Sequence, residues 1–189
     1  MPFLASAELN HNLQNQLLDI AKLDQAVRKE LTEIGWKNAT KPLQNKLLTV
    51  DKNNTRKLKS LLNNRPWFTD SEVGKEGVAA AFLIIQHSPD YEFKEKMLPE
   101  LKQSYLNGTG VTGQDVALLT DRVLIKKGQK QLYGTQADIS KGKVIFKPIL
   151  NPDSVDERRA EMKLPPLAQY KKLLEEMYGL KKVPTLELN

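Results

Sequence analysis

The polar residues that could do chemistry gather in one stretch of this 189-residue chain, between Gln86 and Arg159. His87 follows the most apolar segment of the sequence, and Asp121 and Arg122 stand together among apolar residues. Small polar pockets are built from such an inventory of imidazole, carboxylate, guanidinium and amide groups. We therefore predict a ligand-binding pocket to which nine residues contribute: Gln86, His87, Asp121, Arg122, Gln131, Tyr133, Gln136, Arg158 and Arg159.

The ligand that such a pocket favours is a small anionic molecule or a peptide. Arg122, or the pair Arg158 and Arg159, would hold an anion, because a guanidinium donates two parallel hydrogen bonds to a carboxylate or phosphate. Structural roles stay open for these groups. His87 could cap carbonyl groups at a helix end, Asp121 and Arg122 could make ion pairs between helices, and Arg158 and Arg159 could be surface charge.

A catalytic alternative assigns His87 as general base or acid. Histidine exchanges protons near neutral pH, and Asp121 would orient the ring as a carboxylate does in a hydrolytic triad. Tyr133 or Arg122 would stabilise developing negative charge. The chain has no cysteine and no serine or threonine in a nucleophile motif, so water would have to be activated. This alternative predicts a hydrolase or lyase acting on an anionic substrate.

Several classes of protein are excluded by motif and composition. Without cysteine there is no disulfide framework and no cysteine-based metal centre. The sequence also has no phosphate-binding loop, no dinucleotide fingerprint and no His-Glu-x-x-His zinc motif, so we expect no cofactor and no metal. No apolar run approaches the roughly 18 residues of a membrane span, and the first residues do not resemble a secretory signal. We expect a soluble cytoplasmic protein, with signal-independent export left open.

Charge is concentrated in the N-terminal third. Eleven basic and six acidic residues precede Pro66, whereas the remainder is nearly balanced. The lysines are interspersed with acids and lack interleaved aromatic residues, so a solvated helical face is favoured over a nucleic-acid surface. A protein partner bound through the N-terminal helices is the second alternative function, and it would make the chain a scaffold or interaction protein.

Apolar periodicity predicts the elements that must position these side chains. Two stripes at helical spacing, over residues 13–34 and 43–61, predict an antiparallel helical hairpin; Asp24 and Asn54 interrupt them. Residues 70–87 form a helix that is apolar on nearly every side and is therefore expected at the centre of the core. Further helices are expected near four ranges: 90–107, 112–127, 153–162 and 165–177.

The period changes after residue 128. Residues 131–136 and 143–149 have strand-like composition and flank Lys141 and Gly142, which predicts a small antiparallel β-hairpin. The predicted fold class is mainly α, a multi-helix domain with one short β-hairpin, preceded by an N-terminal helical hairpin. The predicted domains are that hairpin at 1–65, a helical core at 66–178 with the β-hairpin near 131–149, and a tail at 179–189.

The order of these motifs resembles an uncharacterised bacterial domain family. Four features carry the resemblance: Gln86-His87, Asp121-Arg122, the segment Gln131-Leu132-Tyr133-Gly134-Thr135-Gln136, and Arg158-Arg159. The sequence departs from the family pattern at Asn151, where an aspartate is usual. The resemblance covers roughly residues 50–170 and implies a mostly helical domain; it implies no reaction.

Overall fold

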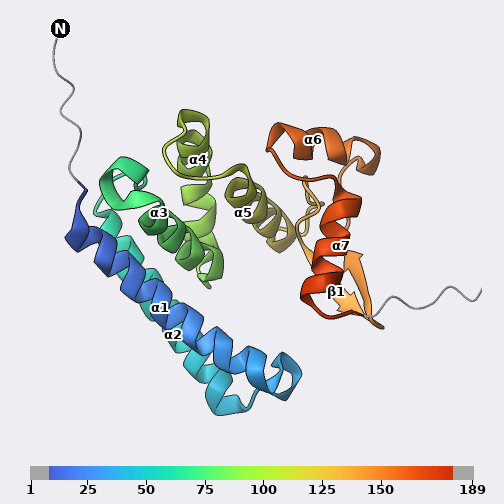
Figure 1. Ribbon diagram of the computed structural model, residues 1–189, viewed down its shortest axis with the longest axis horizontal. Helices are drawn as coiled ribbons and strands as arrows, with labels where there is room; N and C mark the ends of the chain where they lie inside the picture. Colours follow the sequence, from blue (N-terminus) through green and yellow to red (C-terminus); the bar gives the residue numbers. More distant parts are fainter. Residues whose placement is uncertain (1–8, 181–189) are drawn as a thin grey trace, which may run out of the picture. The chain divides into compact units, whose positions relative to one another are not determined.

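The computed structural model describes residues 9–180, which form seven α-helices and one two-stranded antiparallel sheet (Figure 1). The predicted fold class, mainly α with one β-hairpin and an N-terminal helical hairpin, is confirmed. The chain divides into two compact units that meet between Leu119 and Thr120, inside one helix, and each unit is described separately. The predicted domain boundary at residue 65 and the predicted tail stay predictions, and residues 181–189 of that tail lie outside the described residues.

The first unit is built on the predicted hairpin of α1 (His11–Ile34) and α2 (Lys41–Leu62). Gly35 ends α1 with a positive φ of 79°, a conformation that favours glycine. The first apolar stripe is buried from Leu13 to Leu31, whereas Ile34 at its end is exposed. The second stripe is buried at Leu43 and Leu58 and half-buried at its other positions. Helix α3 (Asp70–His87) packs against both α1 and α2. In Figure 1 these are the blue, cyan and green helices.

Helix α3 is the central element of this unit. Thr69 caps its start by accepting a hydrogen bond from the Glu72 amide. Most of its residues from Gly77 to Gln86 are buried, which confirms the expectation from its uniformly apolar composition. Its N-terminal end lies beside the start of α1, where the Asn10 amide donates to the Glu72 carbonyl at 2.7 Å.

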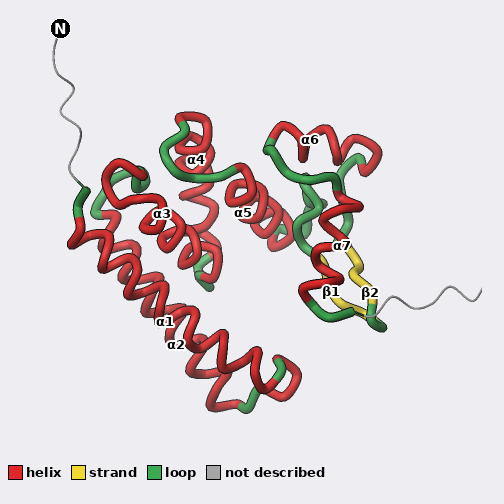
Figure 2. The backbone as a smooth tube through the Cα atoms, in the orientation of Figure 1, coloured by secondary structure: helices red, strands yellow, loops and turns green. Residues whose placement is uncertain are grey.

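The closed end of the α1–α2 hairpin lies beyond α3 and has an apolar cluster of its own. Val27, Leu31 and Leu43 form this cluster, and three partly buried residues surround it: Ala39, Leu47 and Val50. A short 3-10 turn, Trp36–Asn38, closes the hairpin, and Trp36 is 56% exposed. Figure 2 shows this end as a long helical pair joined by a short loop.

Two further helices follow α3, each with a side-chain cap at its start, and the second of them crosses the boundary between the two units. Asp90 caps α4 (Tyr91–Asn107) by accepting a hydrogen bond from the Phe93 amide at 2.9 Å. Helix α5 (Gly113–Lys126) starts with a reciprocal capping box, in which Thr112 and Asp115 each accept a hydrogen bond from the other's backbone N–H.

The second unit contains the β-hairpin, but its strands differ from the prediction. The hairpin pairs β1 (Ala137–Ser140) with β2 (Lys143–Phe146) across the predicted Lys141-Gly142 turn. The expectation that residues 131–136 form the first strand is wrong. Those residues are a loop, joined to the later chain by one isolated bridge between Gln131 and Ile149.

Two helices follow the hairpin in the second unit. Helix α6 (Val155–Glu161) begins after a 3-10 turn at Pro152–Ser154, and α7 (Leu167–Met177) begins directly after Pro166. Within residues 9–180, no helix has both the length and the apolar character to cross a membrane.

Candidate functional site

His87 and Asp24 form a dyad at the end of α3. The ring nitrogen Nδ1 of His87 lies 3.0 Å from both carboxylate oxygens of Asp24. The Asp24 side chain is 1% exposed, whereas that of His87 is 23% exposed. Because a carboxylate only accepts hydrogen bonds, Nδ1 carries the proton, and Nε2 is the ring nitrogen that can take another.

Arg28 ties this dyad to the second helix of the hairpin. Its Nη1 donates to Asp24 Oδ1 at 2.7 Å, one turn away on α1, and its Nη2 donates to Asp51 Oδ2 on α2 at 3.1 Å. Gln25 Nε2 also donates to Asp24 Oδ2 at 2.8 Å. One guanidinium between two carboxylates leaves one formal negative charge, which would balance an imidazolium formed at His87.

The interruptions in the apolar stripes explain why these side chains meet. Asp24 occupies a position in phase with buried Ile20 and Val27, so the helix turns its carboxylate inward. Asn54 does the same on α2, and its Nδ2 donates to the Ile20 carbonyl at 2.9 Å. Both interruptions are visible in the sequence, but the pattern alone indicates no role for them.

The turn after His87 is hydrogen-bonded to α2. Ser88 Oγ lies 2.9 Å from Thr55 Oγ1 and also accepts the Asp90 amide at 3.1 Å. These bonds fix where α3 ends and hence where the imidazole lies. The side-chain oxygen of Gln86, which is buried beside this turn in sequence, accepts no hydrogen bond from the described residues.

The predicted partner of His87 was wrong. The sequence hypothesis paired it with Asp121, yet the carboxylate at its Nδ1 belongs to Asp24. Asp121 lies on α5 in the second unit, and both of its oxygens accept hydrogen bonds from residues 132–135. His87 and Asp24 are 63 residues apart in the sequence, so no local spacing pattern predicts their contact.

Asp121 organises the loop that was expected to be a strand. Its oxygens accept the backbone N–H groups of Leu132, Tyr133 and Thr135 at 2.7–3.0 Å, and the Thr135 hydroxyl at 2.9 Å. The side chain is fully buried. One carboxylate therefore satisfies backbone groups that a strand partner would otherwise satisfy.

Gln131 closes the same loop from its other end. Its Nε2 donates to the carbonyl oxygens of Gln136 and Lys147 at 3.0 and 2.8 Å, and its Oε1 accepts the Gln136 amide at 2.8 Å. The Gln136 side chain donates to Thr135 Oγ1 at 3.0 Å. The structure thus brings Asp121, Gln131 and Gln136 together through the loop backbone.

The two arginines of α6 hold the loop in place. Arg158 Nε donates to the Leu132 carbonyl at 2.8 Å, and Arg159 Nη1 donates to the Tyr133 carbonyl at 2.6 Å. Arg159 lies over the ring of Tyr170 at 4.8 Å. Burial lowers the pKa of Arg159 and raises that of Tyr170 from their ordinary values.

The sequence-predicted site residues therefore fall into separate clusters. Gln86 and His87 belong to the first unit, where His87 meets Asp24. Asp121, Gln131, Gln136, Arg158 and Arg159 share one network in the second unit, in which Tyr133 participates through its backbone. Arg122 lies half-buried on α5. Asp24, Arg28 and Asp51, absent from the predicted site, complete the cluster around His87.

The profile of a family of unknown function, DUF6624, matches residues 11–183. The chain belongs to this family. That confirms the resemblance to an uncharacterised domain family, and the match extends over α1 and α2 as well as the region that carried the resemblance. No curated protein and no solved structure is significantly similar to the chain.

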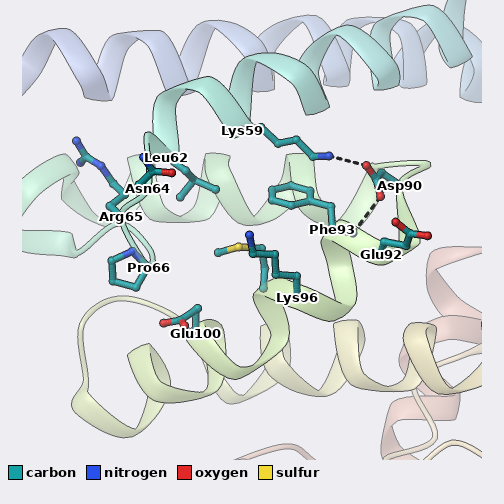
Figure 3. Close-up of a pocket in the computed structure, with 11 residues that line it drawn as sticks. Lys59, Leu62, Asn64, Arg65, Pro66, Asp90, Glu92, Phe93, Lys96 and Glu100 are labelled. Carbon is teal, nitrogen blue, oxygen red and sulfur yellow. Dashed lines mark hydrogen bonds and ion pairs between the residues drawn. The ribbon is translucent and has the colours of Figure 1, made fainter.

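Two cavities of this DUF6624 chain lie along α2 in the first unit. One, of about 560 Å³, is drawn in Figure 3 and has Leu62, Phe93 and Met97 as its apolar wall. Its charged lining is balanced, with three basic and three acidic residues: Lys59, Arg65, Lys96, Asp90, Glu92 and Glu100.

The Lys59–Asp90 ion pair is common to both cavities. Figure 3 shows Lys59 reaching over Phe93 toward Asp90, and Nζ is 2.6 Å from Asp90 Oδ2. The hydrogen bond from the Lys59 ammonium holds the pKa of Asp90 below its ordinary value, and the bond from the Phe93 amide adds to that effect. Among residues 9–180, no three histidine or acidic side chains are grouped in a way that could hold a metal ion.

Proposed function

We propose that this protein is an enzyme that works by general acid–base catalysis, a hydrolase or lyase in which His87 moves the proton. The observation that carries the proposal is the dyad: an imidazole that is partly exposed, with Nδ1 bonded to a carboxylate that is not. Histidine in such a setting has its tautomer fixed, and Nε2 is presented as the base.

The roles of the surrounding residues follow from their contacts. Nε2 of His87 would take a proton from water or from the substrate, and the resulting imidazolium would be stabilised by Asp24. Arg28 and Gln25 keep the Asp24 carboxylate oriented, and Asp51 holds Arg28. These three are positioning residues, because they act through Asp24.

Water is the nucleophile that this arrangement supports. The chain has no cysteine, and Ser88, the hydroxyl next to His87 in sequence, is already bonded to Thr55 and to the Asp90 amide. A hydroxyl held in a helix-ending turn is not aimed at an external carbonyl or phosphoryl group. Hydrolysis by activated water, or proton abstraction in a lyase, is consistent with the residues present.

The test compares His87→Gln with the control His11→Gln, which alters the only other histidine, an exposed residue on the first turn of α1. The wild type is assayed against a panel of ester, amide, phosphoester and β-elimination substrates. We expect turnover that His87→Gln lowers by about 10²–10⁴-fold and His11→Gln leaves unchanged.

Chemical rescue separates catalysis from a structural role. In His87→Ala, added imidazole should restore part of the lost rate, and the restored rate should rise with imidazole concentration. A structural histidine would not be replaced in this way. The proposal fails if the wild type turns over no substrate, or if folded His87→Gln keeps full activity.

A second candidate function is protein binding through the closed end of the α1–α2 hairpin. The observation that favours it is Trp36, exposed at a hairpin end that is stabilised by its own apolar cluster beyond α3. Complementation of a deletion strain discriminates the two functions. Catalysis predicts that His87→Gln is inactive and Trp36→Ser active; protein binding through this end predicts the reverse.

A further inference from the structure

The second cavity along α2 differs from the first in its charge. It has a volume of about 580 Å³ and lies where the turn at Pro89 and Asp90 approaches the outer face of α2. Three basic side chains line it, Lys52, Arg56 and Lys59, against a single acid, Asp90. Because Lys59 and Asp90 neutralise each other at 2.6 Å, Lys52 and Arg56 leave the cavity with a net charge of +2.

Lys52 and Arg56 both have N–H groups that can donate hydrogen bonds to a ligand. Arg56 donates one hydrogen bond from Nη2 to the Asn53 side-chain oxygen, which restricts the orientation of the guanidinium. The other N–H groups of the guanidinium can donate to a ligand. Lys52 makes no ion pair with any described residue. The two residues are one helical turn apart, at i and i+4, so their side chains emerge from the same face of α2.

We propose that this cavity binds a small phosphorylated molecule. A phosphomonoester carries nearly two negative charges at neutral pH and three strong acceptor oxygens, which match an ammonium and a guanidinium side by side. Thr49 and Asn53 add neutral hydrogen-bonding groups. The volume is in the range of sites for organic ligands and exceeds the need of a bare phosphate ion, so the ligand has an organic part.

The site goes beyond the proposed catalysis and does not depend on it. Thr55, which lines the cavity, is bonded to Ser88, the residue after His87. A hydrogen bond therefore connects the wall of the cavity to the turn that ends α3. Binding is nevertheless assigned to Lys52 and Arg56, neither of which contacts the dyad, so a loss of binding and a loss of turnover can be measured separately.

The chain offers a matched control for the test. Lys57 is on the same helix, exposed, and lines neither cavity, so Lys57→Gln removes the same charge as Lys52→Gln without touching the site. Titration calorimetry at fixed ionic strength would use adenosine monophosphate, inorganic phosphate, succinate and a ten-nucleotide single-stranded DNA as probes. Lys52, Arg56 and Lys57 are exposed helical positions, and circular dichroism checks the fold of each variant, including His87→Gln.

We expect adenosine monophosphate to bind more tightly than inorganic phosphate, and succinate to bind at least tenfold more weakly. Lys52→Gln and Arg56→Gln should each weaken adenosine monophosphate binding at least tenfold, while Lys57→Gln and His87→Gln leave it unchanged. The proposal is overturned if no phosphate compound binds at millimolar concentration or if Lys57→Gln weakens binding as much as Lys52→Gln. Binding of the DNA with loss of affinity in all three basic variants would instead show a nucleic-acid surface and also overturn it.

Discussion

Asp24 and Asp121 are both buried carboxylates on helices, yet they have different partners. Asp121 accepts its hydrogen bonds from three backbone amides and one hydroxyl, none of which gains or loses charge near neutral pH. Asp24 faces an imidazole and a guanidinium, and the imidazole is partly exposed. Burial alone therefore does not identify a functional carboxylate. The protonation chemistry and the exposure of its partners make the distinction.

The largest effect in this comparison is expected from Asp121→Asn. An amide presents an NH₂ group to donors that need an acceptor, so buried backbone N–H groups of Leu132 to Thr135 lose partners. We expect the free energy of unfolding to fall by about 3–5 kcal/mol. Denaturant titration measures this, and hydrogen exchange should speed up at those amides first.

Asp138→Asn is the control for that prediction. Its carboxylate is 66% exposed and pairs with Lys147 at 2.8 Å, so the change should be below about 0.5 kcal/mol. A similar small loss in Asp121→Asn would show that the loop is stabilised by the arginines of α6 and not by the carboxylate.

Asp24→Asn should have the opposite profile, with a smaller effect on stability and a larger one on function. Arg28 keeps Asp51 as its ion-pair partner, so we expect a loss of about 1–3 kcal/mol. Under the proposed function, turnover should fall by about 10²-fold or more, because the tautomer of His87 is no longer fixed. The measurements are denaturant titration and kcat/KM on the same preparation.

The double variant Asp24→Asn/His87→Gln sharpens this result. If the two residues act as a unit, the double variant should lose no more activity than His87→Gln alone. Additive losses in kcat/KM, or a loss of stability equal to that of Asp121→Asn with turnover intact, would place Asp24 with Asp121 as a structural carboxylate.

These two carboxylates also show which features the sequence could predict. The helices, their caps and the buried face of α3 follow from periodicity and capping residues, which are local properties. Asp24 and Asn54 were visible as polar residues in phase with apolar stripes, and that signal could have directed attention to them. Their partners could not be predicted, because His87 is 63 residues from Asp24 and no spacing rule connects them.

At residues 131–136 the sequence predicts a strand that the structure does not have. The alternating composition of this segment favours a strand, but the backbone amides there are satisfied by a carboxylate from α5 and carbonyls by arginines from α6. Such side-chain partners, contributed by other elements, replace a neighbouring strand. Composition reports that a segment suits an extended backbone and does not report which groups will bond to it.

Gly134→Ala tests how closely this loop is confined. Gly134 has a φ of 71°, and a Cβ there would lie 2.7 Å from Leu167 Cδ1. Gly142 has the same φ with no neighbouring atom within 4 Å, so Gly142→Ala isolates the backbone strain. We expect about 1 kcal/mol for Gly142→Ala and about 2 kcal/mol for Gly134→Ala in thermal or denaturant unfolding. Equal losses would show that the Leu167 side chain moves aside without cost.

A smaller effect than that of Gly134→Ala is expected at Asp90, a partly exposed carboxylate. Asp90→Ala removes the helix cap of α4 and the ion pair with Lys59, and we expect a loss of about 1 kcal/mol near neutral pH. Asp90→Asn keeps an acceptor for the Phe93 amide and should lose less, because an exposed ion pair contributes little.

The pH dependence of that loss has a defined sign. The Lys59 ammonium lowers the pKa of Asp90 in the folded protein, so its contribution to stability is complete above the ordinary value of 3.8 and disappears as pH falls through the lower folded value. The difference between wild type and Asp90→Ala, measured by urea titration, should therefore be constant from pH 7 to about pH 5 and shrink below pH 4. High salt should reduce the gap between wild type and Asp90→Asn but not the gap between Asp90→Asn and Asp90→Ala, since screening acts on the ion pair and not on the cap. A gap that widens in acid would mean that the carboxylate is destabilising in the folded state, and the lowered pKa would be wrong.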